Sequence, residues 1–447
     1  MKETKKIFYD EMIKIALPIT IQSLFQSSLS MIDQMMVGGL GSVSIAGIGL
    51  GGKFISLFSV TVSALCTGAG ILIAQYYGAK DNKGVSNSFN LNLLFALAIS
   101  VLFSGLSFGI PKVIMGLYST DQAVIEAGTS YLTILGVGII PMTLTLMIST
   151  LLRSIGLAKM PMYASVASVV LNTGLNYGLI YGKWGCPRLG LEGAALATTL
   201  ARIIEMLIII VYLIKVKRKM GLYLNLSLKI EKTFFKKVWL IIYPILLCEF
   251  LWSLGENIYA SIYGRLGTLS CAAMTLTGPV QSLVIGMFSG VSAATGIMVG
   301  NRLGANEVEE AYDRAKAFIK IGTLGSLILS LLVVIIAPFY MQIFNVEAEV
   351  KTITMHILWI YAIIAPVKIL NMIAEGGILR SGGKTHYTLI LDLVGTWLIG
   401  IPLGLISAYL LKWPIEWVYF LLSLEEVFRL VMTLVLFKQK KWIHSIV

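Results

Sequence analysis

The amino-acid sequence predicts an all-α integral membrane protein with twelve transmembrane helices, arranged as two parallel six-helix repeats. Composition is the first reason, because 57% of the residues are hydrophobic and 13% are charged, whereas a soluble domain carries about 25% charge. The second reason is that apolar stretches of about 20 residues, the length that crosses a hydrocarbon core of roughly 30 Å, alternate with short polar turns. The third is that the first half of the chain is repeated in the second half. The alternation typical of a β-barrel is absent, so helical spans are expected.

The apolar windows place the expected spans in order along the chain. The residues before the first span, MKETKKIFYDE, lack the apolar core and cleavage site of a signal peptide, so this span is expected to remain in the mature protein. Pro18 removes one helix hydrogen bond within the first span and is expected to bend it. The predicted spans are about 12–37, 48–73, 88–110, 128–152, 162–182, 191–215, 238–263, 273–299, 317–340, 352–376, 386–410 and 415–438.

The net charge of +12 is concentrated in three short basic regions. These are the N-terminus, the connection 215–237 and the C-terminus, which twelve spans would place on one side of the membrane. The positive-inside rule makes that side the cytoplasm. We therefore expect a multi-pass protein of the cytoplasmic membrane, surrounded by membrane lipid, with both termini in the cytoplasm. A nucleic-acid partner is not expected, because no basic domain lies outside the spans.

Several other classes of function lack their motifs. The four cysteines have no paired spacing and the three histidines are scattered, so neither a disulfide framework nor a His or Cys metal site is predicted. No Walker-type loop or nucleophile motif occurs, and no soluble segment is long enough for a nucleotide-binding domain. An integral membrane enzyme remains an alternative, but it lacks a convergent catalytic set. We therefore expect a protein that is not an enzyme and has no resident cofactor.

The internal duplication appears when the sequence is shifted on itself by 226 positions. This shift superposes Pro18 on Pro244 and GILIAQYYGA on GIMVGNRLGA, with 18 identities over the 62 positions from 18 to 79. A shift of 227 then superposes LLRSIG on ILRSGG and Arg202 on Arg429. The predicted organisation is an N-terminal lobe, a cytoplasmic basic linker and a C-terminal lobe, over residues 1–214, 215–237 and 238–447.

Parallel repeats of six helices are typical of transporters. Because six is even, the second half enters the membrane from the same side as the first, so the repeats are related by an axis along the membrane normal. Transporters of this kind bind substrate between their two halves, and the halves move against each other as rigid bodies during transport. An inert duplicated scaffold is the alternative, and charges within the predicted spans argue against it.

Particular motifs identify the kind of transporter that the chain resembles. ALP and DQMMVGGLG in the first span, AQYYGA, LRSIG, GNRLGA and LRSGGKT recur at the spacing of the multidrug and toxic compound extrusion (MATE) family. The resemblance covers almost the whole chain. It implies a V-shaped, two-lobed monomer that exports amphipathic, often cationic organic compounds, driven by sodium ions or protons. A flippase for lipid-linked or polysaccharide precursors, from the same superfamily, is the alternative, although such proteins often have a basic central cavity.

A carboxylate inside the first span is the main candidate for ion coupling. Gln22, Gln26, Ser30 and Asp33 follow helical steps, so they form one polar stripe that should face other helices. The resemblance implies a cation site made by this aspartate and asparagines of the fifth span, a pattern that Asp33 and Asn172 match. Amide and hydroxyl oxygens suit a sodium ion. The predicted cation-coupling residues are Asp33, Asn172, Asn176 and Thr198, with Na⁺ at the first three; a hydrogen-bonded structural aspartate is the alternative.

The seventh span carries a second acidic stripe. Glu249 and Glu256 lie on one face of the predicted helix, and Trp252 and Tyr259 offer adaptable apolar surface nearby. The resemblance implies coupling or substrate-binding acids on spans seven and ten, which extends the set to Glu375. The predicted second site is therefore Glu249, Glu256, Trp252, Tyr259 and Glu375, and salt bridges to Lys53, Lys368 or Arg380 are the alternative. The remaining intramembrane charges, Asp392, Arg202 with Glu205, and Glu425 with Glu426 and Arg429, are interpreted as interhelical pairs.

Overall fold

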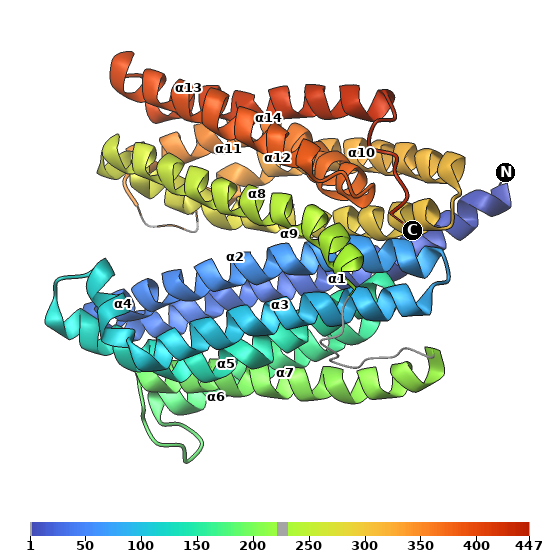
Figure 1. Cartoon of the computed structure of the whole chain (residues 1–447). Helices are drawn as coiled ribbons and strands as arrows, with labels where there is room; N and C mark the ends of the chain where they lie inside the picture. Colours follow the sequence, from blue (N-terminus) through green and yellow to red (C-terminus); the bar gives the residue numbers. More distant parts are fainter. Residues whose placement is uncertain (1, 221–230, 343, 345, 447) are drawn as a thin grey trace. The chain divides into compact units, whose positions relative to one another are not determined.

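A computed structural model describes residues 2–220, 231–342, 344 and 346–446 of the chain. Within these ranges every regular element is a helix (Figure 1). The helices of the first half are α1 (Lys2–Val37), α2 (Ser42–Gly78), α3 (Asn82–Gly109), α4 (Pro111–Tyr118), α5 (Gln122–Ser154), α6 (Lys159–Tyr181) and α7 (Leu191–Met220). Those of the second half are α8 (Lys232–Arg265), α9 (Thr268–Gly304), α10 (Val308–Gln342), α11 (Ala348–Asn371), α12 (His386–Asp392), α13 (Ile401–Leu405) and α14 (Ile415–Lys438).

Nine helices are long and apolar enough to cross a membrane, counted over the described part of the chain. The prediction of an all-α membrane protein is confirmed, while the count of twelve spans stays a prediction. Two further long helices, α6 and α14, carry polar side chains in their middle, among them Asn172 and Asn176 in α6 and Glu425 and Glu426 in α14. Intramembrane polar groups lower the mean hydropathy of a helix and mark functional sites.

Local sequence explains where several helices begin and end. The Asp81 carboxylate accepts a hydrogen bond from the Gly84 backbone N–H at 2.9 Å and caps α3, and Asp121 caps α5 through the Ala123 N–H. Such caps satisfy backbone donors that a helix start leaves free. Helix α6 ends where Gly182 adopts a left-handed conformation with φ of 68°, which glycine reaches without strain. Pro18 lies inside a continuous α1, and the bend predicted there stays a prediction.

The chain forms two compact units. One contains residues 21–73 and 81–238, and the other contains residues 1–20, 74–80 and 239–447. The units follow the two sequence halves, except that the start of α1 and the end of α2 pack with the second half. Helix α7 extends to Met220 and α8 begins at Lys232, so helices continue into both ends of the predicted linker; residues 221–230 lie outside the described residues.

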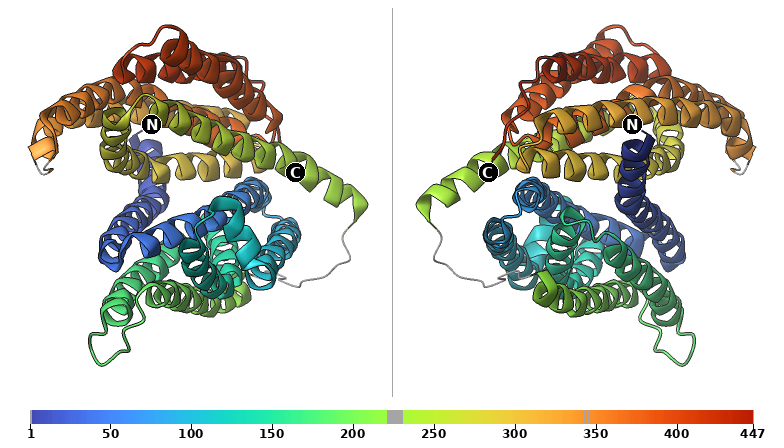
Figure 2. Two further views of the ribbon diagram at one scale, coloured as in Figure 1. Left: turned by 90° about the vertical axis from the view of Figure 1, so that its left-hand side faces the viewer. Right: turned by 90° about the vertical axis from the view of Figure 1, so that its right-hand side faces the viewer.

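The first-half unit is a helical bundle, seen along its helices in Figure 2. Helix α5 packs against both α3 and α7, and α7 also packs against α6. In a core cluster, Ile114 and Met115 of α4 pack with Phe54 of α2 and Leu132 of α5, and all four are buried. This arrangement brings the polar faces of α1, α6 and α7 together.

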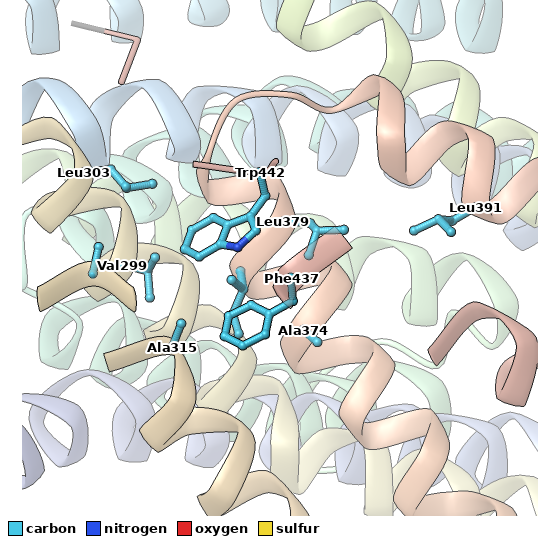
Figure 3. Packing of buried hydrophobic residues seen from close by; sticks show 10 residues of the cluster. Val299, Leu303, Ala315, Ala374, Leu379, Leu391, Phe437 and Trp442 are labelled. Carbon is cyan, nitrogen blue, oxygen red and sulfur yellow. The ribbon is translucent and has the colours of Figure 1, made fainter. Parts of the chain in front are cut away.

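The second-half unit has a core closed by the C-terminal segment. Trp442 is fully buried, and its ring stacks with that of Phe437 at a centroid distance of 5.9 Å. Figure 3 shows both rings between Val299 on one side and Leu379 on the other. The buried Gln75 amide at the end of α2 donates to the Ser381 carbonyl at 2.6 Å and accepts from the Ile446 N–H at 2.6 Å. The end of α2 is thus held to the second-half core by hydrogen bonds as well as by packing.

Candidate functional site

The first-half unit contains a polar cluster that joins α1, α6 and α7. Asn176 Nδ2 in α6 donates to Oδ1 of Asp33 in α1 at 2.7 Å. With the Asn172 amide turned so that both of its ends are satisfied, its nitrogen donates to the same Oδ1 at 3.0 Å and its oxygen accepts from Thr198 Oγ1 at 3.2 Å. Asn172 and Asn176 are one turn apart on α6, so one helix face presents both amides to the carboxylate. The four residues predicted as the cation-coupling set therefore lie together, and their role in coupling stays a prediction.

A cavity of about 910 Å³ opens beside this cluster. Asp33, Asn176, Thr198 and Arg202 contribute to its polar lining. Most of the remaining wall is apolar and includes Leu29, Ile48, Ile55, Leu135, Met142 and Leu146. A mostly apolar cavity of this volume with a few converging polar groups suits a drug-sized organic molecule.

The donor set beside Asp33 is compatible with a small hard cation. Oδ1 of Asn176 is buried and makes no hydrogen bond within the described structure. Asn176 donates to Asp33, and the Asn172 amide presents either its nitrogen or its oxygen on this side depending on its orientation, so amide oxygens can supply ligands for a sodium ion. The described residues contain no group of three or more His, Cys, Asp or Glu side chains that could hold a metal ion. A cation at Asp33 would therefore depend on amide and hydroxyl oxygens.

The second-half unit has its own cavity, of about 310 Å³, with an acidic wall. Its lining includes three carboxylates and one ammonium group, those of Glu256 in α8, Glu425 and Glu426 in α14, and Lys368 in α11. The buried Tyr259 hydroxyl donates to Glu425 Oε2 at 2.6 Å. A Cβ at Gly400 would lie 2.1 Å from this hydroxyl oxygen, so glycine there leaves room for the hydrogen bond.

The two cavities use equivalent positions of the repeat. At the shift of 226, Tyr259 takes the position of Asp33, and at the shift of 227, Glu425 takes the position of Thr198. The acid stands on the first helix of one half and on the last helix of the other. Each cavity is thus lined by one carboxylate and one hydroxyl at these equivalent positions, and the helix that supplies the carboxylate differs between the two units.

A family model matches the chain twice at this repeat. The MatE model covers residues 18–178 and again residues 244–406, and the two matches begin at the positions that the shift of 226 superposes. Together they cover more than half of the chain. The chain belongs to the MatE family. It is a membrane transporter of the multidrug and toxic compound extrusion (MATE) family rather than an enzyme, as the sequence predicts.

Curated relatives of this MATE chain are similar over most of their length. A probable multidrug resistance protein of Bacillus subtilis, YoeA, is 27% identical over 425 residues, which are 92% of this chain and 89% of the relative. A probable multidrug resistance protein of Streptococcus pneumoniae, NorM, is 27% identical over 403 residues, 88% of this chain and 86% of the relative.

Solved structures of MATE proteins have the same fold. A crystal structure of MATE in complex with MaL6 matches with a TM-score of 0.86 at 20% identity and covers 96% of this chain and 95% of its own. A multidrug resistance MATE family transporter in an outward-facing conformation gives the same TM-score, 0.86, and the same coverage.

An ion network lies in the same unit as the acidic cavity of this MATE protein. Arg429 in α14 forms ion pairs with Asp392 and with Glu375, the latter at 3.1 Å, and approaches Glu426 at 4.0 Å. Glu375 lies in a π-helical segment, Met372–Leu379, between α11 and α12. Wide turns of this kind often occur at functional sites because they redirect side chains.

The structure separates the five residues predicted for the second site. Glu256 and Tyr259 line the acidic cavity. Glu249 forms an ion pair with Arg380 at 2.9 Å, which is the alternative considered for it. Glu375 is buried in the Arg429 network, and Trp252 is 43% exposed. Glu249, Glu375 and Trp252 therefore do not line the cavity. Helical spacing grouped Glu249 and Trp252 with Glu256, and the family resemblance added Glu375.

Sequence reasoning missed Glu425 as a cavity residue. The interpretation of Arg202 and Glu205 as a pair is confirmed at 3.3 Å. The interpretation of Glu426 and Arg429 as a pair is likewise confirmed, at 4.0 Å. Glu425, which was grouped with them, also accepts the Tyr259 hydrogen bond and lines the cavity. Neighbouring residues on a helix point about 100° apart, so the carboxylates of Glu425 and Glu426 accept hydrogen bonds from different residues, Tyr259 and Asn371. That geometric signal was present in the sequence.

Proposed function

We propose that this MATE transporter is an antiporter that exports amphipathic, often cationic organic compounds across the cytoplasmic membrane, driven by inward movement of protons or sodium ions. It works as a monomer with both termini in the cytoplasm. One observation carries the proposal: the Asp33 carboxylate stands on the wall of a cavity of about 910 Å³ and is held by amides of α6. A carboxylate at membrane depth that is reached from a cavity is suited to exchange a proton or cation.

The acidic cavity of the second-half unit supports a division of roles. Its lining has three carboxylates and one ammonium group, and Lys368 lies 3.8 Å from Glu426. Glu256 forms no ion pair in the described part of the chain, and it shares its electrostatic interaction with Lys368 with Glu425 and Glu426, so the carboxylates outnumber the cation and can attract a positively charged ligand. Tyr259, Tyr263 and Tyr419 add aromatic surface, which attracts organic cations. We assign Asp33 to coupling and Glu256 to recognition of positive charge.

Replacing Asp33 by asparagine should abolish uphill efflux while leaving expression intact. Asparagine keeps the size and hydrogen bonding of the side chain but cannot take up a proton or neutralise a cation. Dye efflux from proteoliposomes, measured separately with a proton gradient and a sodium gradient, checks this and identifies the ion. Asp121→Asn is the matched control, because asparagine also caps a helix and Asp121 lies at the exposed start of α5. Undiminished uphill transport by Asp33→Asn would remove Asp33 from the coupling role.

Replacing Glu256 by glutamine should weaken binding of a cationic dye about tenfold, since a charge-assisted contact in a cavity is worth about 1.5–3 kcal/mol. A neutral dye of similar shape should bind as it does to the parent protein. Equilibrium dye binding to purified protein measures both, and the exposed Glu349→Gln is the control for lost charge. Equal binding of the cationic dye by parent and Glu256→Gln would show that recognition lies elsewhere.

A further inference from the structure

The connection between α6 and α7 projects from one end of the first-half bundle, away from its other helices (Figures 1 and 2). Its sequence, GKWGCPRLG at residues 182–190, contains two basic residues, Lys183 and Arg188, and no acid. Both basic side chains are exposed, and neither forms an ion pair within the described part of the chain. Trp184 is 74% exposed. The connection therefore presents a large aromatic ring together with two positive charges that no carboxylate balances.

The exposed ring is held in place by the rest of the connection and by α6. Trp184 has φ of 57°, a left-handed conformation that a bulky residue adopts only where its surroundings impose it. The Leu189 N–H donates to the Leu179 carbonyl at 2.8 Å and fastens the connection to α6. The indole ring lies 5.2 Å from the ring of Tyr177, and a Cβ at Gly174 would lie 3.8 Å from it. Trp184 therefore points back along α6 toward the membrane rather than away from it into water.

The second half repeats the lysine–tryptophan pair in its corresponding connection. Lys412 and Trp413 follow the eleventh predicted span, as the first pair follows the fifth. Lys412 has φ of 51°, so each pair contains one left-handed residue, and Trp413 is 39% exposed. This connection has an acid nearby, Glu416, which lies 3.4 Å from His356. Because five and eleven are both odd numbers of crossings, the predicted spans place both connections on the side of the membrane opposite the N-terminus.

We infer that the connection 182–190 is a docking surface for anionic phospholipids, with Lys183 and Arg188 on the headgroup phosphate and Trp184 at the level where headgroups meet acyl chains. Tryptophan prefers this level because its ring is apolar and its N–H is polar. Ammonium and guanidinium groups bind phosphate oxygens by charge-assisted hydrogen bonds. A lipid covers the ring and the two charges together, whereas a small soluble anion would leave the ring in water. The inference goes beyond the proposed function and takes from it only the side of the membrane on which the connection lies.

Quenching of Trp184 fluorescence in lipid nanodiscs provides the test. The protein is placed in phosphatidylcholine nanodiscs in which a small fraction of either phosphatidylglycerol or phosphatidylcholine carries brominated acyl chains, which quench nearby tryptophan. The difference between the parent protein and Trp184→Phe isolates the signal of Trp184. Brominated phosphatidylglycerol should be enriched about tenfold at this residue over brominated phosphatidylcholine, because each basic residue near an anionic lipid strengthens binding several-fold. The preference should shrink at about 1 M salt, which screens exposed charges. Both faces of a nanodisc carry the same lipids, so the result does not depend on orientation.

Charge variants separate headgroup binding from simple burial of the ring. Lys183→Gln combined with Arg188→Gln should abolish the preference for phosphatidylglycerol while leaving quenching by phosphatidylcholine unchanged. Lys112→Gln removes an exposed positive charge of the same unit and should keep the preference. Trp413, isolated in the same way with Trp413→Phe, should show a weaker preference, because it has one basic neighbour and an acid nearby.

Three results would overturn the inference. They are equal quenching of Trp184 by the two lipids in the parent protein, an unchanged preference in the double variant, and no quenching by either lipid, which would place the ring away from the membrane. None of these measurements involves transport, so failed dye efflux by the parent protein would contradict the proposed function alone.

Discussion

Replacing Arg429 by methionine should destabilise the second-half unit by about 3–5 kcal/mol, the usual cost of removing one partner from a buried ionic network. The change leaves Asp392 and Glu375, which are both buried, without their shared cation. Glu426 would retain Lys368, at 3.8 Å, and the hydrogen bond from Asn371 Nδ2, at 2.7 Å. The measurement is the apparent melting temperature of the detergent-solubilised protein, followed by size-exclusion chromatography after heating.

Three further variants distinguish the effect of removing the positive charge of Arg429 from the effect of removing its packing contacts. Arg429→Lys should retain part of the stability because it keeps the cation. The triple variant Arg429→Met, Asp392→Asn, Glu375→Gln should recover most of it, since no unpaired acid remains. Arg202→Met combined with Glu205→Gln removes the repeat-related arginine together with its buried acidic partner and should cost about 1 kcal/mol or less, because no unpaired buried acid remains. A single Arg429→Met variant as stable as this double variant would mean that Asp392 and Glu375 are not charged in the folded protein.

Alanine at Gly78 or at Gly304 should each destabilise the second-half unit by about 1–3 kcal/mol, the cost of overpacking a close contact. A Cβ at Gly78 would lie 1.8 Å from the Asn301 carbonyl oxygen, and a Cβ at Gly304 would lie 1.8 Å from the Gln75 carbonyl oxygen. The two contacts are related by the shift of 226. Ala74 with Gly78 and Gly300 with Gly304 form small-residue pairs four apart, a spacing that lets membrane helices approach closely.

The ends of α2 and α9 approach each other through equivalent glycines, Gly78 and Gly304, so each substitution is a control for the other. The two substitutions should have similar effects on the apparent melting temperature, because each moves one backbone carbonyl away from the other helix. Gly278 lies in the same α9 with no atom within 4 Å of an added Cβ, so Gly278→Ala should stabilise the helix by up to about 1 kcal/mol. If Gly78→Ala behaves like Gly278→Ala, the ends of α2 and α9 do not cross at this distance.

The candidate site was predictable to different degrees in the two halves. Asp33, Asn172, Asn176 and Thr198 could be grouped because helical spacing and the MATE motifs agree on them. The second half could be predicted less well, since the partners of its acids lie on other helices. Glu249 and Glu256 lie on one face by spacing, yet Glu249 pairs with Arg380 and Glu256 lines the acidic cavity. Pairing across helices depends on which neighbouring helix is near, and helical spacing within one segment does not contain that information.

The sequence by itself determined the membrane class, the duplication and the small-residue spacing in AQYYG and GNRLG, because each is a property of composition or of local periodicity. The sequence also showed that Arg202 and Arg429 occupy equivalent positions of the repeat. Only the tertiary structure decided that Arg429 is surrounded by acids while Arg202 faces a cavity, and that Glu425 belongs with Tyr259. Those outcomes depend on side chains from helices far apart in the chain, and a buried charge is defined by such neighbours rather than by its own segment.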